Sequence, residues 1–171
     1  IEKYYILKKV HSLSAFDGVE GDYLEFGVFA GSSFCHSIRC YRKLSRLDNR
    51  TVKTRFFGFD SFAGFGPLSE DDEHPFYLDA NFETSIEKVS RRIARVAKGI
   101  DYKLVSGFFS DSLKNGAEEM GIVQSRIIFI DSDTYSSSKD ALVFSLPTVQ
   151  EGTYIILDDF YSYKGSMEKG V

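Results

Sequence analysis

The chain contains little proline and little cysteine, and it has no long apolar run. Its 171 residues include three prolines and two cysteines. So little proline excludes a collagen-like protein or a proline-rich linker. The apolar runs are all shorter than the roughly 18 residues that suggest a membrane span, so we expect no membrane-embedded segment. The length predicts one globular domain over residues 1–171.

The two cysteines, Cys35 and Cys40, are five positions apart. On a helix this spacing places them on different faces, so we expect no disulfide between them. The sequence around them also lacks the spacing of a metal-ligand motif. Reduced thiols, together with the lack of a visible signal peptide, favour a cytoplasmic location.

Positive charge is too scarce for a dedicated nucleic-acid binder. The formal net charge is −4, from 25 acidic and 21 basic side chains. The basic residues gather locally between Arg39 and Arg55, where they face one acid, Asp48. We interpret this stretch as a solvated helix end, with a patch for phosphate or another anionic partner as the alternative.

Short apolar runs alternate with segments of helical periodicity, which predicts an α/β fold. Because the runs are uninterrupted, we expect strands buried on both faces of a parallel sheet, joined by right-handed crossovers. The expected strands are 22–28, 55–60, 102–106, 126–131 and 153–158, and the expected helices are 33–47, 82–98, 110–120 and 136–146. Residues 61–81 fit neither period and predict a long lid or binding loop.

The residues that follow the strands are the candidates for chemistry, because ligands of open parallel sheets bind beyond the carboxyl ends of the strands. The first strand leads into a turn with Gly27 and Gly31, followed by Ser33 at a helix start. Glycines there allow close backbone approach, and the helix start leaves N–H groups free for a ligand. Asp60, at the tip of the second strand, is placed to accept ribose hydroxyls, with a role in capping the next turn as the alternative.

Carboxylates also close the fourth and fifth strands. Asp131 and Asp133 follow one strand, and Asp158 and Asp159 follow the other. Because neighbouring strands are about 4.8 Å apart, these side chains converge and would repel one another unless a cation lay between them. An all-oxygen cluster suits Mg²⁺ better than zinc. The alternative is a set of solvated, helix-capping acids.

Histidines carry less information. His11 and His36 fall in helical segments, where we expect partly buried or surface side chains. His74 lies in the long loop beside an acidic run, and a role as general base or substrate contact competes there with that of an ordinary loop residue.

In five segments the sequence resembles the S-adenosylmethionine-dependent O-methyltransferases of the macrocin/mycinamicin sugar type. They are YLEFGVFAGSS (23–33), FFGFDSFAGF (56–65), SGFFSDSL (106–113), IDSDTYSSSKDAL (130–142) and ILDDFYSYKG (156–165). The resemblance implies a Rossmann-like class I methyltransferase fold. It also implies transfer of a methyl group from S-adenosylmethionine to a hydroxyl of a sugar or glycosylated small molecule, with a divalent cation such as Mg²⁺.

The resemblance also assigns roles to particular residues. It implies cofactor binding by three groups of residues, one for each end of the cofactor and one for its ribose: Glu25, Gly27, Gly31 and Ser33 along the methionine part, Asp60 and Ser61 at the ribose, Ser110 and Asp111 near the adenine. The implied metal ligands are Asp131, Asp158 and Asp159. Asp131 is the first candidate for the base, with Asp133 and His74 as alternatives.

Two features depart from the pattern. Thr134 stands where catechol-type enzymes have a lysine, which favours a sugar acceptor. Only about ten residues follow Phe160, which is too few for the helix and final antiparallel strand pair of a complete class I sheet. We therefore expect a fragment or a shortened member. A non-catalytic module of the same fold and a nucleotide-dependent oxidoreductase are the competing hypotheses, and a homo-oligomer stays open.

Overall fold

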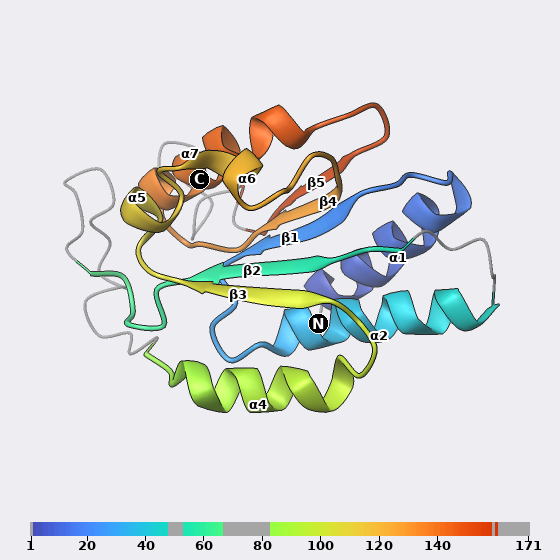
Figure 1. The fold of residues 1–171 in the computed structure, drawn as a ribbon, viewed down its shortest axis with the longest axis horizontal. Helices are drawn as coiled ribbons and strands as arrows, with labels where there is room; N and C mark the ends of the chain where they lie inside the picture. The colour runs from blue at the N-terminus through green and yellow to red at the C-terminus, as the bar shows by residue number, and fades with distance from the viewer. Residues whose placement is uncertain (1, 48–52, 67–82, 159, 161–171) are drawn as a thin grey trace.

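The computed structural model describes residues 2–47, 53–66, 83–158 and 160, which form a parallel sheet between two layers of helices (Figure 1). The strands are β1 (Asp22–Phe26), β2 (Phe56–Asp60), β3 (Tyr102–Ser106), β4 (Ser125–Ile130) and β5 (Tyr154–Leu157). Their order is β3-β2-β1-β4-β5 and every neighbouring pair is parallel. The chain runs outward from β1 to β3 and then returns to β4, so the strand order reverses between β1 and β4.

Three helices cover one face of the sheet (Figure 1). They are α1 (Glu2–Phe16), α2 (Ser32–Leu47) and α4 (Ile86–Val96). Each contributes fully buried apolar side chains, such as Leu7, Phe34 and Ile93, to one core cluster. In α4 the Ser85 side chain caps the first turn by accepting from the backbone N–H of Lys88, so this helix begins at Ile86.

The opposite face carries shorter helices (Figure 1). They are α5 (Phe109–Ser112), α6 (Gly116–Glu119) and α7 (Tyr135–Ser145), which continues into the 3₁₀ turn η2 (Leu146–Thr148). A second core cluster lies between these helices and the sheet. There the rings of Phe26 and Phe59 stack at 4.7 Å, and Phe144 of α7 packs edge-on against both.

The α/β class and all five predicted strands are confirmed. Burial on both faces holds for β1, β2 and β4, whose apolar side chains are buried, but it is wrong for β3 and β5. Both lie at the edges of the described sheet, where residues such as Ile155 are 46% exposed. The expected helix 110–120 is also wrong, because residues 113–115 divide it into α5 and α6, and Gly116, the first residue of α6, has φ +75°.

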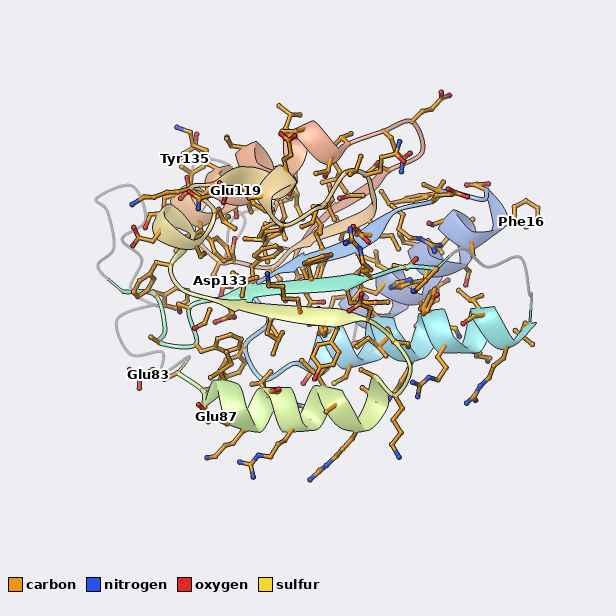
Figure 2. The ribbon with its side chains drawn as sticks, in the orientation of Figure 1. Phe16, Glu83, Glu87, Glu119, Asp133 and Tyr135 are labelled. Atoms are coloured by element: carbon orange, nitrogen blue, oxygen red, sulfur yellow. The ribbon has the colours of Figure 1, made fainter. Side chains whose placement is uncertain are left out.

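His11 is a further correction, because it is 1% exposed instead of partly buried or at the surface. Its ring stacks on Tyr23 at 5.4 Å, and burial lowers its pKa to about 3. Both cysteines are free, as predicted, with Cys35 buried and Cys40 partly exposed. In the described part of the chain, none of the helices is both long enough and apolar enough to cross a membrane. At the far end of α1, Phe16 points into solvent (Figure 2).

Candidate active site

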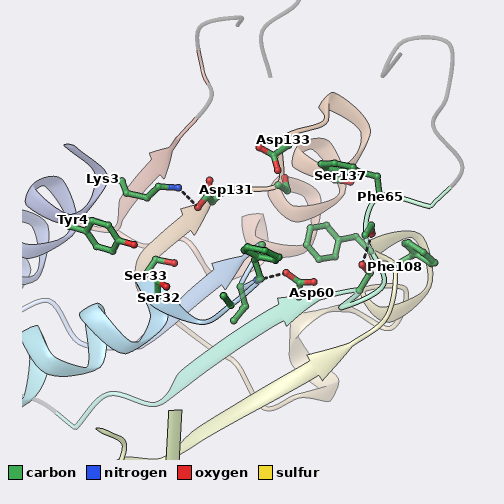
Figure 3. Close-up of a pocket in the computed structure, with 18 residues that line it drawn as sticks. Lys3, Tyr4, Ser32, Ser33, Asp60, Phe65, Phe108, Asp131, Asp133 and Ser137 are labelled. Carbon is green, nitrogen blue, oxygen red and sulfur yellow. Dashed lines mark hydrogen bonds and ion pairs between the residues drawn. The ribbon is translucent and has the colours of Figure 1, made fainter. Parts of the chain in front are cut away.

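A cavity of about 320 Å³ lies at the carboxyl ends of β1, β2 and β4, where the strand order reverses (Figure 3). Its walls come from the turn after β1, the segment after β2, the start of α5, the segment after β4 and the first turn of α1. The lining residues are Lys3, Tyr4, Gly27, Val28, Phe29, Ala30, Ser32, Ser33, Asp60, Ser61, Gly64, Phe65, Phe108, Phe109, Asp131, Ser132, Asp133 and Ser137.

Gly27 brings the ends of β1 and β4 together. It has φ +91°, and a Cβ atom built on it would lie 1.8 Å from the carbonyl oxygen of Asp131. The β1–β4 junction is held by a backbone hydrogen bond from Asp131 N–H to the carbonyl of Phe26, and Gly27 N–H ties the turn to β2 by donating to the carbonyl of Phe59. Only glycine fits this approach, so the turn and Asp131 can share one cavity wall.

Gly31 serves the packing of the turn instead of lining the cavity. It is buried with φ +74°, and a Cβ atom there would lie 3.2 Å from the side chain of Val89 in α4. Its N–H donates to the carbonyl of Val28. Ser33, one residue into α2, does line the cavity.

Glu25 lies in β1 behind the cavity and is fully buried. Its carboxylate accepts a 2.6 Å hydrogen bond from the Ser33 hydroxyl and a 2.5 Å bond from the Tyr23 hydroxyl, which in turn accepts from Ser37. Burial raises the pKa of Glu25 to about 7, and these donors moderate the increase. Glu25 therefore holds the Ser33 hydroxyl by a hydrogen bond and does not itself line the cavity.

Asp60 joins the segments after β1 and β2. One carboxylate oxygen accepts from the N–H of Phe29 at 2.7 Å, and the other accepts from the N–H of Phe62 at 2.6 Å. Both partners have positive φ, a conformation that costs energy for non-glycine residues. Burial raises the pKa of Asp60, and the backbone donors oppose that shift. Its side chain reaches the cavity (Figure 3), where each oxygen keeps lone pairs for a ligand hydroxyl.

Asp131 and Asp158 meet at the ends of β4 and β5 with Lys3 between them. The Lys3 ammonium is 2.7 Å from a carboxylate oxygen of each. Burial raises the pKa of Asp131, and the neighbouring carboxylate of Asp158 adds to the increase. The charge of these two acids raises the pKa of Lys3 despite its own partial burial. The predicted convergence of these two carboxylates is confirmed, and the cation that pairs with them here is a lysine.

The segment after β4 also shapes the cavity wall. Asp133 has φ +62° and lines the cavity with its neighbour Ser132, whose hydroxyl is 2.9 Å from that of Ser138. Thr134 caps α7 by accepting from the N–H of Ser137. Asp133 therefore lies in the wall of the cavity, on the segment between β4 and α7 (Figure 3).

The remaining predicted site residues lie partly in the cavity and partly outside it. Ser61 lines the cavity, with its hydroxyl donating to the carbonyl of Gly64. Ser110 and Asp111 are exposed, and neither lines the cavity. His74 and Asp159 lie outside the described residues. Among the described residues, no group of three or more His, Cys, Asp or Glu side chains has the geometry of a metal site.

Lys3, Tyr4, Phe108 and Phe109 are among the cavity residues that were not predicted from the sequence. The two phenylalanines immediately precede Ser110 and Asp111, the pair predicted to approach the adenine, and they belong to the same segment. Lys3 has no local signal, because a lysine at the start of a helix ordinarily points to solvent.

Comparison with known proteins assigns the chain to a family. Residues 5–169 match the macrocin O-methyltransferase (TylF) family, and the chain belongs to it. It is 30% identical over 154 residues to the mycinamicin III 3''-O-methyltransferase of Micromonospora griseorubida, an alignment that covers 84% of this chain and 57% of that protein. It is 29% identical to an 8-demethyl-8-(2,3-dimethoxy-alpha-L-rhamnosyl)-tetracenomycin-C 4'-O-methyltransferase of Streptomyces olivaceus, over 84% and 54% of the two chains.

Solved structures agree on the fold. The O-methyltransferase NovP superposes with a TM-score of 0.77 at 23% identity, over 94% of this chain and 65% of NovP. The calicheamicin methyltransferase CalS11 gives a TM-score of 0.72 at 19% identity, over 88% and 62%. The predicted family and methyltransferase fold are therefore confirmed, and the chain spans somewhat more than half the length of the curated relatives it matches.

The Gly27 contact leads to a stability prediction. Gly27→Ala should lower the free energy of unfolding by roughly 3–5 kcal/mol, because the methyl group must push the Asp131 carbonyl away at a positive φ. Gly99→Ala is the matched control, since Gly99 has φ +73° with open space around it and should lose only about 1–2 kcal/mol. Urea unfolding measures both, and equal losses would contradict a steric role for Gly27.

The buried carboxyl of Glu25 leads to a pH prediction. Its folded-state pKa of about 7 exceeds the ordinary 4.5, so the folded protein binds the extra proton between these values. The contribution of Glu25 to the free energy of unfolding should therefore fall by roughly 3 kcal/mol as the pH rises from 4.5 to above 7. Urea unfolding of the parent chain and Glu25→Gln across this range isolates the effect, and a pH-independent difference between them would refute it.

Proposed function

We propose that this chain carries the cofactor and metal sites of a sugar O-methyltransferase. The reaction would transfer a methyl group from S-adenosylmethionine to a hydroxyl of a sugar or glycosylated small molecule. The observation that carries the proposal is the single cavity that joins the Gly27 turn, Asp60 and Asp131. Its volume is in the range of small-molecule sites, roughly 300–1,000 Å³.

The walls of the cavity suit the parts of the cofactor in turn. The Asp60 oxygens are free to accept from the two ribose hydroxyls while they hold the backbone of Phe29 and Phe62. Phe108 and Phe109 offer apolar surface for the adenine, in place of the exposed Ser110 and Asp111. The Gly27 turn and Ser33 would lie along the methionine part, with Glu25 as the support for Ser33.

The carboxylates of Asp131 and Asp158 fit a hard divalent cation. Their oxygens already meet at one cationic atom, and carboxylate oxygens are the ligands that Mg²⁺ prefers. Asp159 is proposed as the third ligand. A cation bound there would lower the pKa of a substrate hydroxyl. Asp131 is the first candidate to accept the proton of that hydroxyl, with Asp133 and His74 as alternatives.

The acceptor and the surroundings are proposed from the relatives and from the chain. The two curated relatives are named for O-methylation of mycinamicin III and of a rhamnosyl-tetracenomycin C, and we propose a glycosylated small molecule as the acceptor. The free cysteines suit a reducing compartment such as the cytoplasm. The negative net charge supports a small-molecule acceptor over a nucleic acid.

Cofactor binding can be tested without knowing the acceptor. Asp60→Asn should weaken S-adenosylmethionine binding by roughly tenfold or more in calorimetry, because it removes the charge that accepts the ribose hydroxyls. Glu118→Gln, at an exposed acid of α6, should bind like the parent chain. The proposal fails if the parent chain does not bind the cofactor at millimolar concentration, or if Asp60→Asn binds equally well.

The metal is tested separately with methyl transfer to mycinamicin III as a first trial acceptor. Excess EDTA should abolish transfer and added Mg²⁺ should restore it. Asp158→Asn should lower the rate by at least about 100-fold, more than the loss of an outer-shell partner, and Mg²⁺ should not rescue it. Glu151→Gln, at an exposed turn, is the control. Transfer that proceeds unchanged in EDTA and in Asp158→Asn would show that the carboxylates are structural.

A further inference from the structure

Lys3 occupies the point at which the two carboxylates converge. Its ammonium lies 2.7 Å from Asp131 (Figure 3) and 2.7 Å from Asp158, which directly follow two neighbouring strands and are far from Lys3 in sequence. The side chains of the two acids are only 16% and 24% exposed, so this ion pair is partly withdrawn from water. It is not one of the solvated surface pairs that contribute little to structure.

The start of α1 is held in the position that this ion pair requires. The carbonyl of Tyr4, next to Lys3, accepts a 2.9 Å hydrogen bond from the Nε2–H of His36 in α2. The rings of Tyr4 and His36 also pack edge-to-face at 5.2 Å. One turn later Leu7 is fully buried in the core. The backbone that carries Lys3 is therefore anchored, and its side chain lines the cavity.

An ammonium and a divalent cation cannot share this pair of acids. A magnesium ion bound to the same oxygens would sit about 2.1 Å from each. It would then occupy nearly the same space as the Lys3 ammonium, and two positive charges at that distance repel strongly. The side chain of lysine has a flexible four-carbon stem, and Lys3 is 32% exposed, so the ammonium has a route out of the pair.

We propose that Lys3 is a built-in competitor of the divalent cation: its ammonium holds Asp131 and Asp158 when no metal is bound, and metal binding requires Lys3 to leave. This inference rests on the proposed metal site. The lysine keeps the two carboxylates together in the metal-free chain and lowers the apparent affinity for the metal. Once displaced, its ammonium moves to the rim of the cavity that it already lines.

Calorimetric titration of the full chain with Mg²⁺ provides the first test. Lys3→Met keeps the apolar stem and removes the charge, so it should bind Mg²⁺ about tenfold or more tightly than the parent chain. Lys9→Met, at an exposed position of the same helix, should leave the affinity unchanged. Asp158→Asn should abolish binding. Lys3→Gln repeats the test with a polar side chain if Lys3→Met folds poorly.

Amine acetylation of the parent chain provides a second readout that does not depend on activity. Saturating Mg²⁺ should raise the acetylation rate of Lys3, because the displaced ammonium enters solvent, while Lys9 should react at the same rate throughout. In Asp158→Asn the reactivity of Lys3 should not respond to Mg²⁺. Mass spectrometry of the N-terminal peptide reports both lysines in one experiment.

The outcomes separate this inference from the proposed function. If Lys3→Met binds Mg²⁺ as the parent chain does, or more weakly, Lys3 does not compete and the inference is overturned, while the metal site stands. Magnesium binding that leaves the acetylation of Lys3 unchanged also overturns it. If neither the parent chain nor Lys3→Met binds Mg²⁺, the metal site itself fails and the competition fails with it, and the cofactor titration still decides the rest of the proposed function.

Discussion

The close contact between Gly27 and the carbonyl of Asp131 is the constraint on which the site depends. β1 continues into α2 on one face of the sheet, and β4 continues into α7 on the other. Two segments that diverge in this way leave a crevice between them, and the width of the crevice depends on how closely the two strand ends approach each other. At Gly27 a single Cβ atom would be enough to force them apart. The absent side chain therefore lets the turn after β1 and the acid pair face one another.

Two carboxyl groups hold the turn after β1, on one side of this crevice, from two directions. Glu25 is fully buried, which is costly for a carboxylate, and the hydroxyls of Tyr23 and Ser33 offset that cost. Asp60 holds two residues of positive φ, Phe29 and Phe62, through their backbone N–H groups. Strained residues persist only where their surroundings over-determine them. The turn after β1 is thus held by two carboxyls. Glu25 holds it through the Ser33 hydroxyl, and Asp60 holds it through the N–H of Phe29.

The features predicted from sequence were those with a local physical signal. Buried strands have uninterrupted apolar runs, and parallel topology then places Asp60, Asp131 and Asp158 at one edge of the sheet without further information. The exposure of β3 and β5 could not be predicted in this way, because an edge strand differs from a central strand only in its neighbours. The division of 110–120 into α5 and α6 goes with a positive φ at Gly116, which the pattern of apolar residues does not report.

Lys3 shows a different limit of prediction from the sequence. Converging carboxylates need a cation, but this requirement specifies a charge and not a chemical species. A lysine more than a hundred residues away meets the same electrostatic requirement. Lys3 reaches the two acids because α1 packs against α2 through the contacts of Tyr4 with His36. The local sequence around Lys3 does not indicate this packing. An acid cluster at a strand edge therefore identifies a cation site, and the helices that pack beside it decide whether the protein supplies a cation of its own.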